Sequence, residues 1–291
     1  MKRTEFIKKA AFAGLSIGLA MEMKDLFKDW QAGKQGQRMP VLFVGHGNPM
    51  NAILQNDFSN RWRSLAKELP KPKAILVISA HWETEGTLAT AMEKPRTIHD
   101  FGGFPQELFD QQYPAPGSPY WAKETKKLVK SQELILDHQW GLDHGTWSVL
   151  KPMYPEADIP VYQMSINYRL NPSQHYQLAS ELKALREKGI LIVGSGNIVH
   201  NLRMVNWNAS GAYDWAQEFD AKVYQLIQSG EHKSLIDYQS LGKAAQLSVP
   251  SNEHYIPLLY SLGLTDTKDE IRVFNKEFDL ASVSMTSYVF A

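Results

Sequence analysis

The chain has 291 residues, which is enough to bury a sizeable core in one large α/β domain or two small ones. Its 31 lysines and arginines balance 31 aspartates and glutamates, so we expect no nucleic-acid partner and no membrane partner. Cysteine is absent, which excludes disulfides, thiolate metal sites and cysteine nucleophiles, and leaves His, Asp and Glu as ligands for any metal.

The N-terminus has the layout of a signal peptide. In residues 1–20, basic residues precede a short apolar run, AAFAGLSIGLA, which is too short to span a bilayer comfortably. The start KRTEFIKK also resembles a degenerate twin-arginine signal, which suggests export to the periplasm. The alternative is an amphipathic N-terminal helix on a cytoplasmic protein. Residues 21–38 are polar and are predicted to be a linker, so the folded domain is expected at 39–291.

Within that domain, strand-like and helix-like segments alternate. Continuous apolar runs of strand length occur at 41–45, 74–80, 159–166 and 190–196. Helix-like segments occur at 58–69, 118–131, 173–188 and 211–229. A last strand pair is expected at 271–275 and 282–290. This order predicts a single α/β domain with a mostly parallel central sheet covered by helices on both faces.

Four histidines stand at predicted strand ends or at a helix start. His46, His81 and His200 each follow a strand, and His254 precedes an apolar helix for which Ser251 is the expected N-cap. Ligands bind outside the carboxyl ends of parallel strands, so these imidazoles can converge there. Such a cluster suits Zn(II) or Fe(II). Each histidine alone fits equally well as a hydrogen-bonded structural residue.

A fifth histidine, His144, lies in GLDHGTW, at the expected start of a helix through TWSVLKPMY. There an imidazole can act as a base, or can cap the helix. Asp143 is expected either to orient His144 or to cap that helix, and His99 is expected to line the pocket. His138, His175 and His232 have surface-like contexts and receive no role. No G-x-S-x-G motif is present, so serine-hydrolase chemistry is not expected.

Seven sequence blocks occur in a fixed order: GHGNPM, SAHWET, TIHDFGGFP, YPAPGSP, DHGTWSVL, GSGNIVHNL and NEHYIPLLY. Together they resemble the bacterial branch of the DOPA 4,5-dioxygenase extradiol family. That family belongs to the class III extradiol ring-cleavage dioxygenases and is related to the catalytic subunit of protocatechuate 4,5-dioxygenase. The resemblance covers about residues 39–291, which it identifies as an extradiol dioxygenase catalytic domain.

The resemblance implies a three-layer α/β/α domain that holds one non-haem metal ion per chain. It implies metal ligands at His46, His81, His200 and His254, and acid/base chemistry at His144. The implied reaction is cleavage of a DOPA-like catechol by O2 to a semialdehyde, so a small aromatic diol and O2 are the expected partners. Oligomeric state is not indicated.

The identity of the metal and the surroundings of the ring stay open. Fe(II) is expected for activity, but ring-cleaving Fe(II) sites commonly combine two histidines with one carboxylate, and an all-histidine set also suits Zn(II). The nearest candidate carboxylate is Glu253. Trp82, Trp147 and Phe101 are candidates to wall the substrate ring. The alternative functions are a metal-binding protein of the same fold without oxygenase activity and a zinc-dependent hydrolase.

Overall fold

The computed structural model describes residues 38–209 and 211–291. The predicted leader at 1–20 and all but the last residue of the predicted linker at 21–38 lie outside the described residues. In the part of the chain that is described, no helix is both long and apolar enough to cross a membrane.

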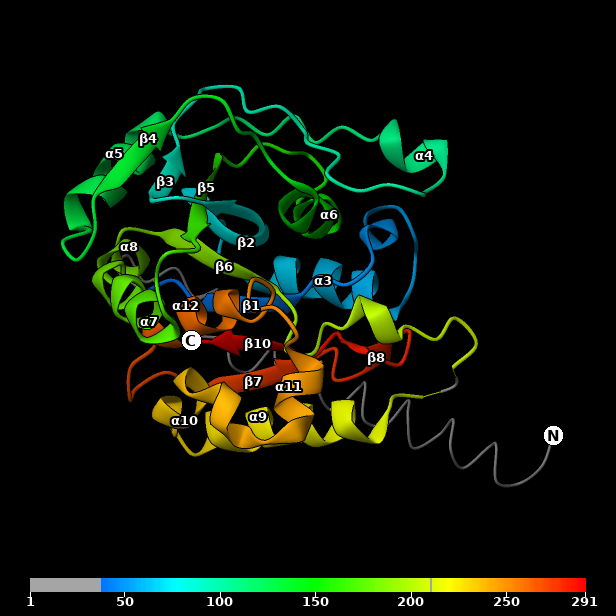
Figure 1. The fold of residues 1–291 in the computed structure, drawn as a ribbon. Coiled ribbons are helices and arrows are strands. Elements are labelled where there is room, and N and C mark those ends of the chain that lie inside the picture. The colour runs from blue at the N-terminus through cyan, green and yellow to red at the C-terminus, as the bar shows by residue number, and fades with distance from the viewer. Residues whose placement is uncertain (1–37, 210) are drawn as a thin grey trace.

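One eight-stranded sheet forms the centre of the molecule, in the order β4-β3-β5-β2-β6-β1-β10-β7 (Figure 1). Its strands are β1 (Val41–Gly45), β2 (Ala74–Thr84), β3 (Thr87–Thr90), β4 (Leu134–Asp137), β5 (Val161–Asn167), β6 (Ile190–Gly196), β7 (Ile271–Phe274) and β10 (Ser287–Phe290). The central strands β5, β2, β6 and β1 are parallel, as are β3 and β4. Antiparallel pairing joins β3 to β5, β1 to β10 and β10 to β7. The predicted mostly parallel sheet is therefore confirmed.

The sequence predicts one pair of strands at the C-terminus, and the structure has two pairs there. The antiparallel pair β10 and β7 matches the expected pairing within 271–275 and 282–290. The residues between them also form a separate two-stranded sheet, β8 (Phe278–Asp279) with β9 (Val283–Ser284).

Alternate side chains of the central strands enter two different hydrophobic cores. Val41 and Phe43 face one core, whereas Leu42 and Val44 face the other, as the two-residue period of a strand requires. The first core is covered by α7 (Pro172–Glu181), α9 (Asp214–Gln228) and α12 (Ile256–Gly263). The second is covered by α3 (Asp57–Glu68) and α6 (His144–Met153). Both faces of the sheet are buried, so the expected three-layer α/β/α architecture is confirmed (Figure 1).

Two predicted helices differ from those observed. The predicted helix 173–188 is divided into α7 and α8 (Ala184–Glu187), because the N–H of Leu182 bonds to the carbonyl of Ala179 in a tighter, three-residue turn. Ser251 is not the N-cap of α12, which begins at Ile256 after a turn. Its hydroxyl instead donates to Glu253 at 2.9 Å. His254 therefore lies on the turn before the helix.

The remaining short elements connect the layers. They are η1 (Pro49–Ala52), α4 (Gln106–Phe109), α5 (Pro119–Leu128), η2 (Leu202–Met204), α10 (His232–Ile236), η3 (Tyr238–Leu241) and α11 (Lys243–Ser248). The predicted helices 118–131 and 211–229 correspond to α5 and α9 with shorter ends.

A buried arginine ties the amino ends of β1 and β6 to the C-terminus. The Nε of Arg186 donates to the carbonyl of Met39 at 2.7 Å, and its two terminal nitrogens reach the Asp269 carboxylate at 2.8 Å each. The same two nitrogens also donate to the carbonyls of Leu264 and Phe290, at 2.9 and 3.2 Å. Every side-chain nitrogen of this fully buried guanidinium therefore has a partner.

Candidate active site

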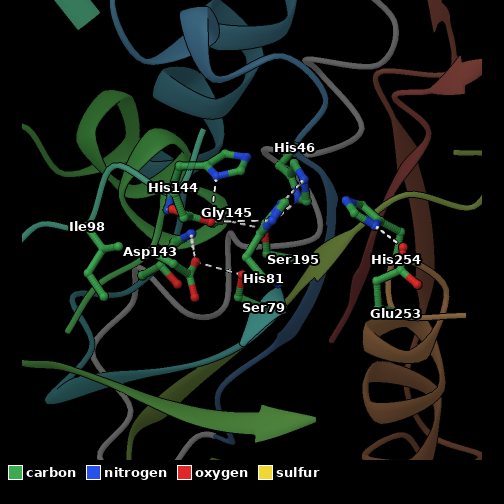
Figure 2. A network of polar contacts seen from close by, with 12 residues as sticks. His46, Ser79, His81, Ile98, Asp143, His144, Gly145, Ser195, Glu253 and His254 are labelled. Atoms are coloured by element: carbon green, nitrogen blue, oxygen red, sulfur yellow. Dashed lines mark hydrogen bonds and ion pairs between the residues drawn. The ribbon is translucent and has the colours of Figure 1, made fainter. Parts of the chain in front are cut away.

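Three of the predicted histidines converge at the opposite edge of the sheet, beyond the carboxyl ends of the central strands (Figure 2). His46 directly follows β1, and His254 lies on the turn before α12. His81 lies inside β2, which runs on to Thr84 beyond the predicted end at residue 80, with a register irregularity between Ile78 and Glu83. Ring nitrogens of the three lie within 4.8 Å of one another, and the Nε2 atoms of His46 and His81 are 3.1 Å apart.

Burial keeps these three imidazoles neutral. Desolvation, followed by the charges of the neighbouring histidines, holds the pKa of His46 and that of His254 well below the usual value. Desolvation and the nearby His144 lower the pKa of His81 to about 3, although Asp100 opposes this shift. Neutral imidazoles carry a free lone pair, which is the form that binds a metal.

The hydrogen bonds of His46 determine which of its nitrogens carries that lone pair. The Ser195 hydroxyl donates its one hydrogen to the carbonyl of Gly145 at 2.5 Å, so it must accept from His46 Nδ1 at 3.1 Å. His46 is therefore protonated at Nδ1, and its Nε2 presents a lone pair to the cluster.

The other two rings are held in the same way by carboxylates. His254 Nδ1 donates to Glu253 at 3.0 Å, which leaves Nε2 unprotonated. That Nε2 is buried and has no hydrogen-bond partner among the described residues. His81 Nδ1 faces the Asp100 carboxylate at 3.4 Å. Ring nitrogens of three neutral imidazoles thus lie close together, and a metal cation bound between them would stabilise this arrangement.

His200 lies beside this trio and is not one of its members. Its ring stacks on that of His254, with centroids 3.5 Å apart and planes inclined by 8°. Desolvation lowers the pKa of His200 to about 4, against an opposing effect of Glu253. His200, Glu253 and His254 form a second group of closely spaced ligand atoms. The assignment of His200 as a metal ligand stays a prediction.

His144 occupies the first residue of α6, as expected from the sequence, and its ring centroid lies 3.8 Å from that of His81. Asp143 caps the helix, because its Oδ1 accepts the backbone N–H of Thr146 at 3.0 Å. The Asp143 carboxylate also accepts from Ser79 and Gln163, so it is not available to orient the His144 ring. Of the two roles expected for Asp143, its contacts fit the capping role.

The carboxylate that contacts the His144 ring is Asp100, which the sequence interpretation missed. Its Oδ2 lies 2.9 Å from His144 Nδ1, and its Oδ1 accepts the backbone N–H of His144 at 2.8 Å. Asp100 stands in the block TIHDFGGFP, so the one signal for it in the sequence was its membership of that block.

Two positions in the site are packed so tightly that only glycine fits. A Cβ on Gly145 would lie 2.5 Å from the Ser79 hydroxyl and 2.8 Å from Cδ2 of His81, so no larger residue fits between α6 and β2. A Cβ on Gly196 would lie 2.2 Å from the carbonyl oxygen of His254, so glycine lets that turn approach β6.

Of the candidate ring-wall residues, one adjoins the histidines. The ring of Phe101 meets His144 edge to face at 5.5 Å. Trp147 is fully buried in the core, and Trp82 stacks on Trp140 at 5.7 Å. His99 Nε2 forms a hydrogen bond with the carbonyl of Gln111 at 2.9 Å, and its ring packs beside Phe101. His99 therefore supports the loop that carries Phe101.

His175 contradicts its surface-like sequence context. It is 1% exposed and lies 3.1 Å from the Tyr260 hydroxyl, and burial lowers its pKa to about 4. It belongs to α7, whose packing against α12 covers it.

Comparisons with known proteins show the family to which the chain belongs. Residues 40–291 match the sequence model of the family described as the catalytic LigB subunit of aromatic ring-opening dioxygenase. A protein of Escherichia coli named 4,5-DOPA dioxygenase extradiol is 47% identical, over 86% of this chain and 94% of its own length. A protein of the same name from Beta vulgaris is 34% identical, over 89% of this chain and 98% of its own length. A crystal structure of an uncharacterized protein from E. coli K12 matches with a TM-score of 0.77 and 41% identity, over 87% of this chain and 100% of that one.

Proposed function

Because this chain belongs to the LigB family and is a class III extradiol dioxygenase, we propose that it opens the ring of a DOPA-like catechol with O2 to give a semialdehyde. The observation that carries the proposal is the trio of His46, His81 and His254, whose ring nitrogens lie within 4.8 Å of one another, with the Nε2 atoms of His46 and His81 3.1 Å apart. The names of the relatives support the choice of substrate class, because two of them are called 4,5-DOPA dioxygenases.

We propose that this trio holds one non-haem metal ion, with His200 as a fourth ligand beside His254. Fe(II) is the ion proposed for activity, and Zn(II) is an alternative occupant because imidazole nitrogens suit both. When bound, the ion supplies Lewis-acid binding of the two catechol oxygens and the redox chemistry that lets O2 react.

His144 is the proposed general base and acid. Its Nδ1 is occupied by Asp100, so Nε2 is the atom free to take a proton from a catechol hydroxyl and later return it to the opened product. A group in this role contributes roughly 10²–10⁴-fold to the rate. Phe101, edge to face with His144, offers an apolar surface to the substrate ring. Asp143 contributes by capping α6 and so fixing the backbone of His144.

The family relation favours this function over the two alternatives, a metal-binding protein without catalysis and a zinc-dependent hydrolase. The test uses protein purified without oxygen, loaded with Fe(II), and supplied with DOPA and a panel of other catechols. We expect O2 uptake matched by formation of a yellow ring-opened product.

The matched variants are His144→Gln and His138→Gln, since His138 is exposed and has no proposed role. We expect the first to lose ring cleavage and the second to keep it. Absence of O2 uptake with every catechol, in protein that has bound Fe(II), would contradict the proposal. Oxygen-independent ester or amide hydrolysis would favour the hydrolase instead.

A further inference from the structure

Among the described residues, Asp100 is the one carboxylate that contacts both His81 and His144. Its Oδ2 lies 2.9 Å from His144 Nδ1 and 3.4 Å from His81 Nδ1. Its Oδ1 accepts the backbone N–H of His144 at 2.8 Å, which anchors the carboxylate at the start of α6. The two imidazole rings that share it are only 3.8 Å apart between centroids.

The contacts of Asp100 with α6 fix which oxygen faces the two rings. Its Oδ1 accepts the backbone N–H of His144, so Oδ2 is the oxygen that faces His144 Nδ1 and His81 Nδ1. An ionised carboxylate can only accept hydrogen bonds. His144 Nδ1, at 2.9 Å, is therefore the donor in this contact, so a neutral His144 ring keeps its lone pair on Nε2.

We propose that Asp100 is a shared positioning residue, which holds His144 in the Nδ1–H tautomer and orients His81 so that its Nε2 faces His46. This inference rests on the proposed function and extends it, because it joins the group proposed to move protons to a group proposed to bind the metal. Glu253 and Ser195 each support one histidine of the cluster, whereas Asp100 supports two.

The arrangement has a consequence during proton transfer. When His144 accepts a proton on Nε2 it becomes a cation beside His81, and a second positive charge next to a metal ligand is unfavourable. The Asp100 carboxylate, in contact with both rings, offsets that charge. A neutral group in the same place would keep the shape of the site but lose this effect.

The test replaces Asp100 by asparagine, which has the same shape. Its oxygen still accepts the His144 backbone N–H, but its NH2 group then faces His144 Nδ1 and can only donate to it. We expect 15N-histidine NMR of Asp100→Asn to show His144 in the Nε2–H tautomer, where the wild type shows Nδ1–H. The His144→Gln variant assigns the signal among the nine histidines.

The second readout is binding of Zn(II), a probe that does not react with O2. Because outer-shell partners of a ligand typically change metal affinity 10–100-fold, we expect the dissociation constant of Asp100→Asn to rise by about that factor. Asp110→Asn is the matched control, since Asp110 lies on the same segment and its carboxylate contacts the exposed Gln106. Asp100→Glu restores the carboxylate and is expected to keep the Nδ1–H tautomer.

Each half of the inference has its own contrary result. A His144 that remains Nδ1–H in Asp100→Asn would overturn the role of Asp100 in choosing the tautomer. A Zn(II) dissociation constant within about twofold of wild type would overturn its role toward His81, given the 10–100-fold expectation. Neither readout uses ring cleavage. If the wild type cleaves no catechol, but Asp100→Asn still shows the changed tautomer and the weaker Zn(II) binding, the proposed function is contradicted and this inference stands.

Discussion

The two ends of the central sheet differ in whether their buried polar groups have hydrogen-bond partners. At the amino ends of β1 and β6, the guanidinium of Arg186 is fully buried, and each of its nitrogens donates to a carbonyl or to Asp269. At the carboxyl ends, the ring nitrogens of three neutral histidines face one another, and Nε2 of His254 has no partner among the described residues. The first end satisfies its buried charge with hydrogen bonds among its own residues, whereas the second gathers neutral ring nitrogens that suit a metal cation.

We infer that the arginine end serves the stability of the fold and the histidine end serves metal binding and catalysis. A buried polar atom without a partner costs roughly 1–3 kcal/mol, and a bound cation would remove that cost at Nε2 of His254. Changes at the arginine end should therefore alter the stability of the protein and leave metal binding unaffected. Changes at the histidine end should alter metal binding and catalysis, with a smaller effect on stability. The following predictions test that separation, from the largest expected effect to the smallest.

His46→Ala should abolish tight metal binding. It removes one of the three proposed first-shell nitrogens, so the loss should exceed the 10–100-fold change typical of an outer-shell partner. Metal content per chain and Zn(II) titration measure it, with His138→Ala as the exposed control. If His46→Ala binds Zn(II) as tightly as the wild type, His46 is no ligand, and the contrast between the two ends fails.

His144→Gln should keep the metal and lose most ring cleavage. A lost general base is worth about 10²–10⁴-fold in rate, or ~3–5.5 kcal/mol of barrier. Metal content and initial rate should be measured on the same preparation. A near wild-type rate would remove the acid/base role, and loss of the metal would make His144 a ligand.

Arg186→Met should lower the free energy of unfolding by about 3–5 kcal/mol, the cost of removing one member of a buried ion pair. In this variant Asp269 still has Arg38 as an ion-pair partner, with Nη1 at 2.9 Å. We therefore expect a loss of stability near the lower end of that range. Chemical denaturation measures the change. Zn(II) stoichiometry should stay at the wild-type value, and a variant that folds but loses metal would show that the two ends are coupled.

The matched control for that variant is Arg169→Met, which breaks an exposed pair with Glu85 at 2.9 Å. Exposed pairs contribute about 0–1 kcal/mol, so its stability should scarcely change.

His175 should make stability depend on pH. Its pKa is about 4 in the folded protein, against 6.5 as the ordinary value, so the unfolded chain binds the proton more readily. Stability should therefore be at its full value above pH 6.5 and fall as the pH drops toward 4, by up to about 3 kcal/mol at ~1.4 kcal/mol per pH unit. Comparing wild type with His175→Gln isolates this share from that of the active-site histidines. An identical pH dependence in the two proteins would refute it.

Much of the fold could be predicted because burial on both faces makes a strand visible in sequence. Runs such as 74–80 and 190–196 are continuously apolar, and both form central strands. His46 and His81 could be placed near each other because each follows or extends such a strand. Helix ends were less well defined: Ser251 resembles a cap, yet it bonds to Glu253 and the helix begins five residues later.

Sequence reasoning missed contacts between residues that lie far apart along the chain. Asp100 meets the His144 ring 44 residues later, and no periodic pattern connects a loop aspartate with a helix start. For Asp143 the sequence left two roles open, and only the structure shows its carboxylate accepting from the backbone of Thr146 and from Gln163. His175 has polar neighbours in sequence, and only the packing of α7 on α12 buries it.

The central claim is that the facing Nε2 atoms of His46, His81 and His254 form a metal site. Anomalous X-ray diffraction from crystals grown with Zn(II) tests it most directly. The account predicts one ion per chain bound by these three Nε2 atoms at about 2.0–2.1 Å, and the same map decides whether His200 joins them. An ion bound elsewhere, or one bound through Nδ1 atoms, would contradict it.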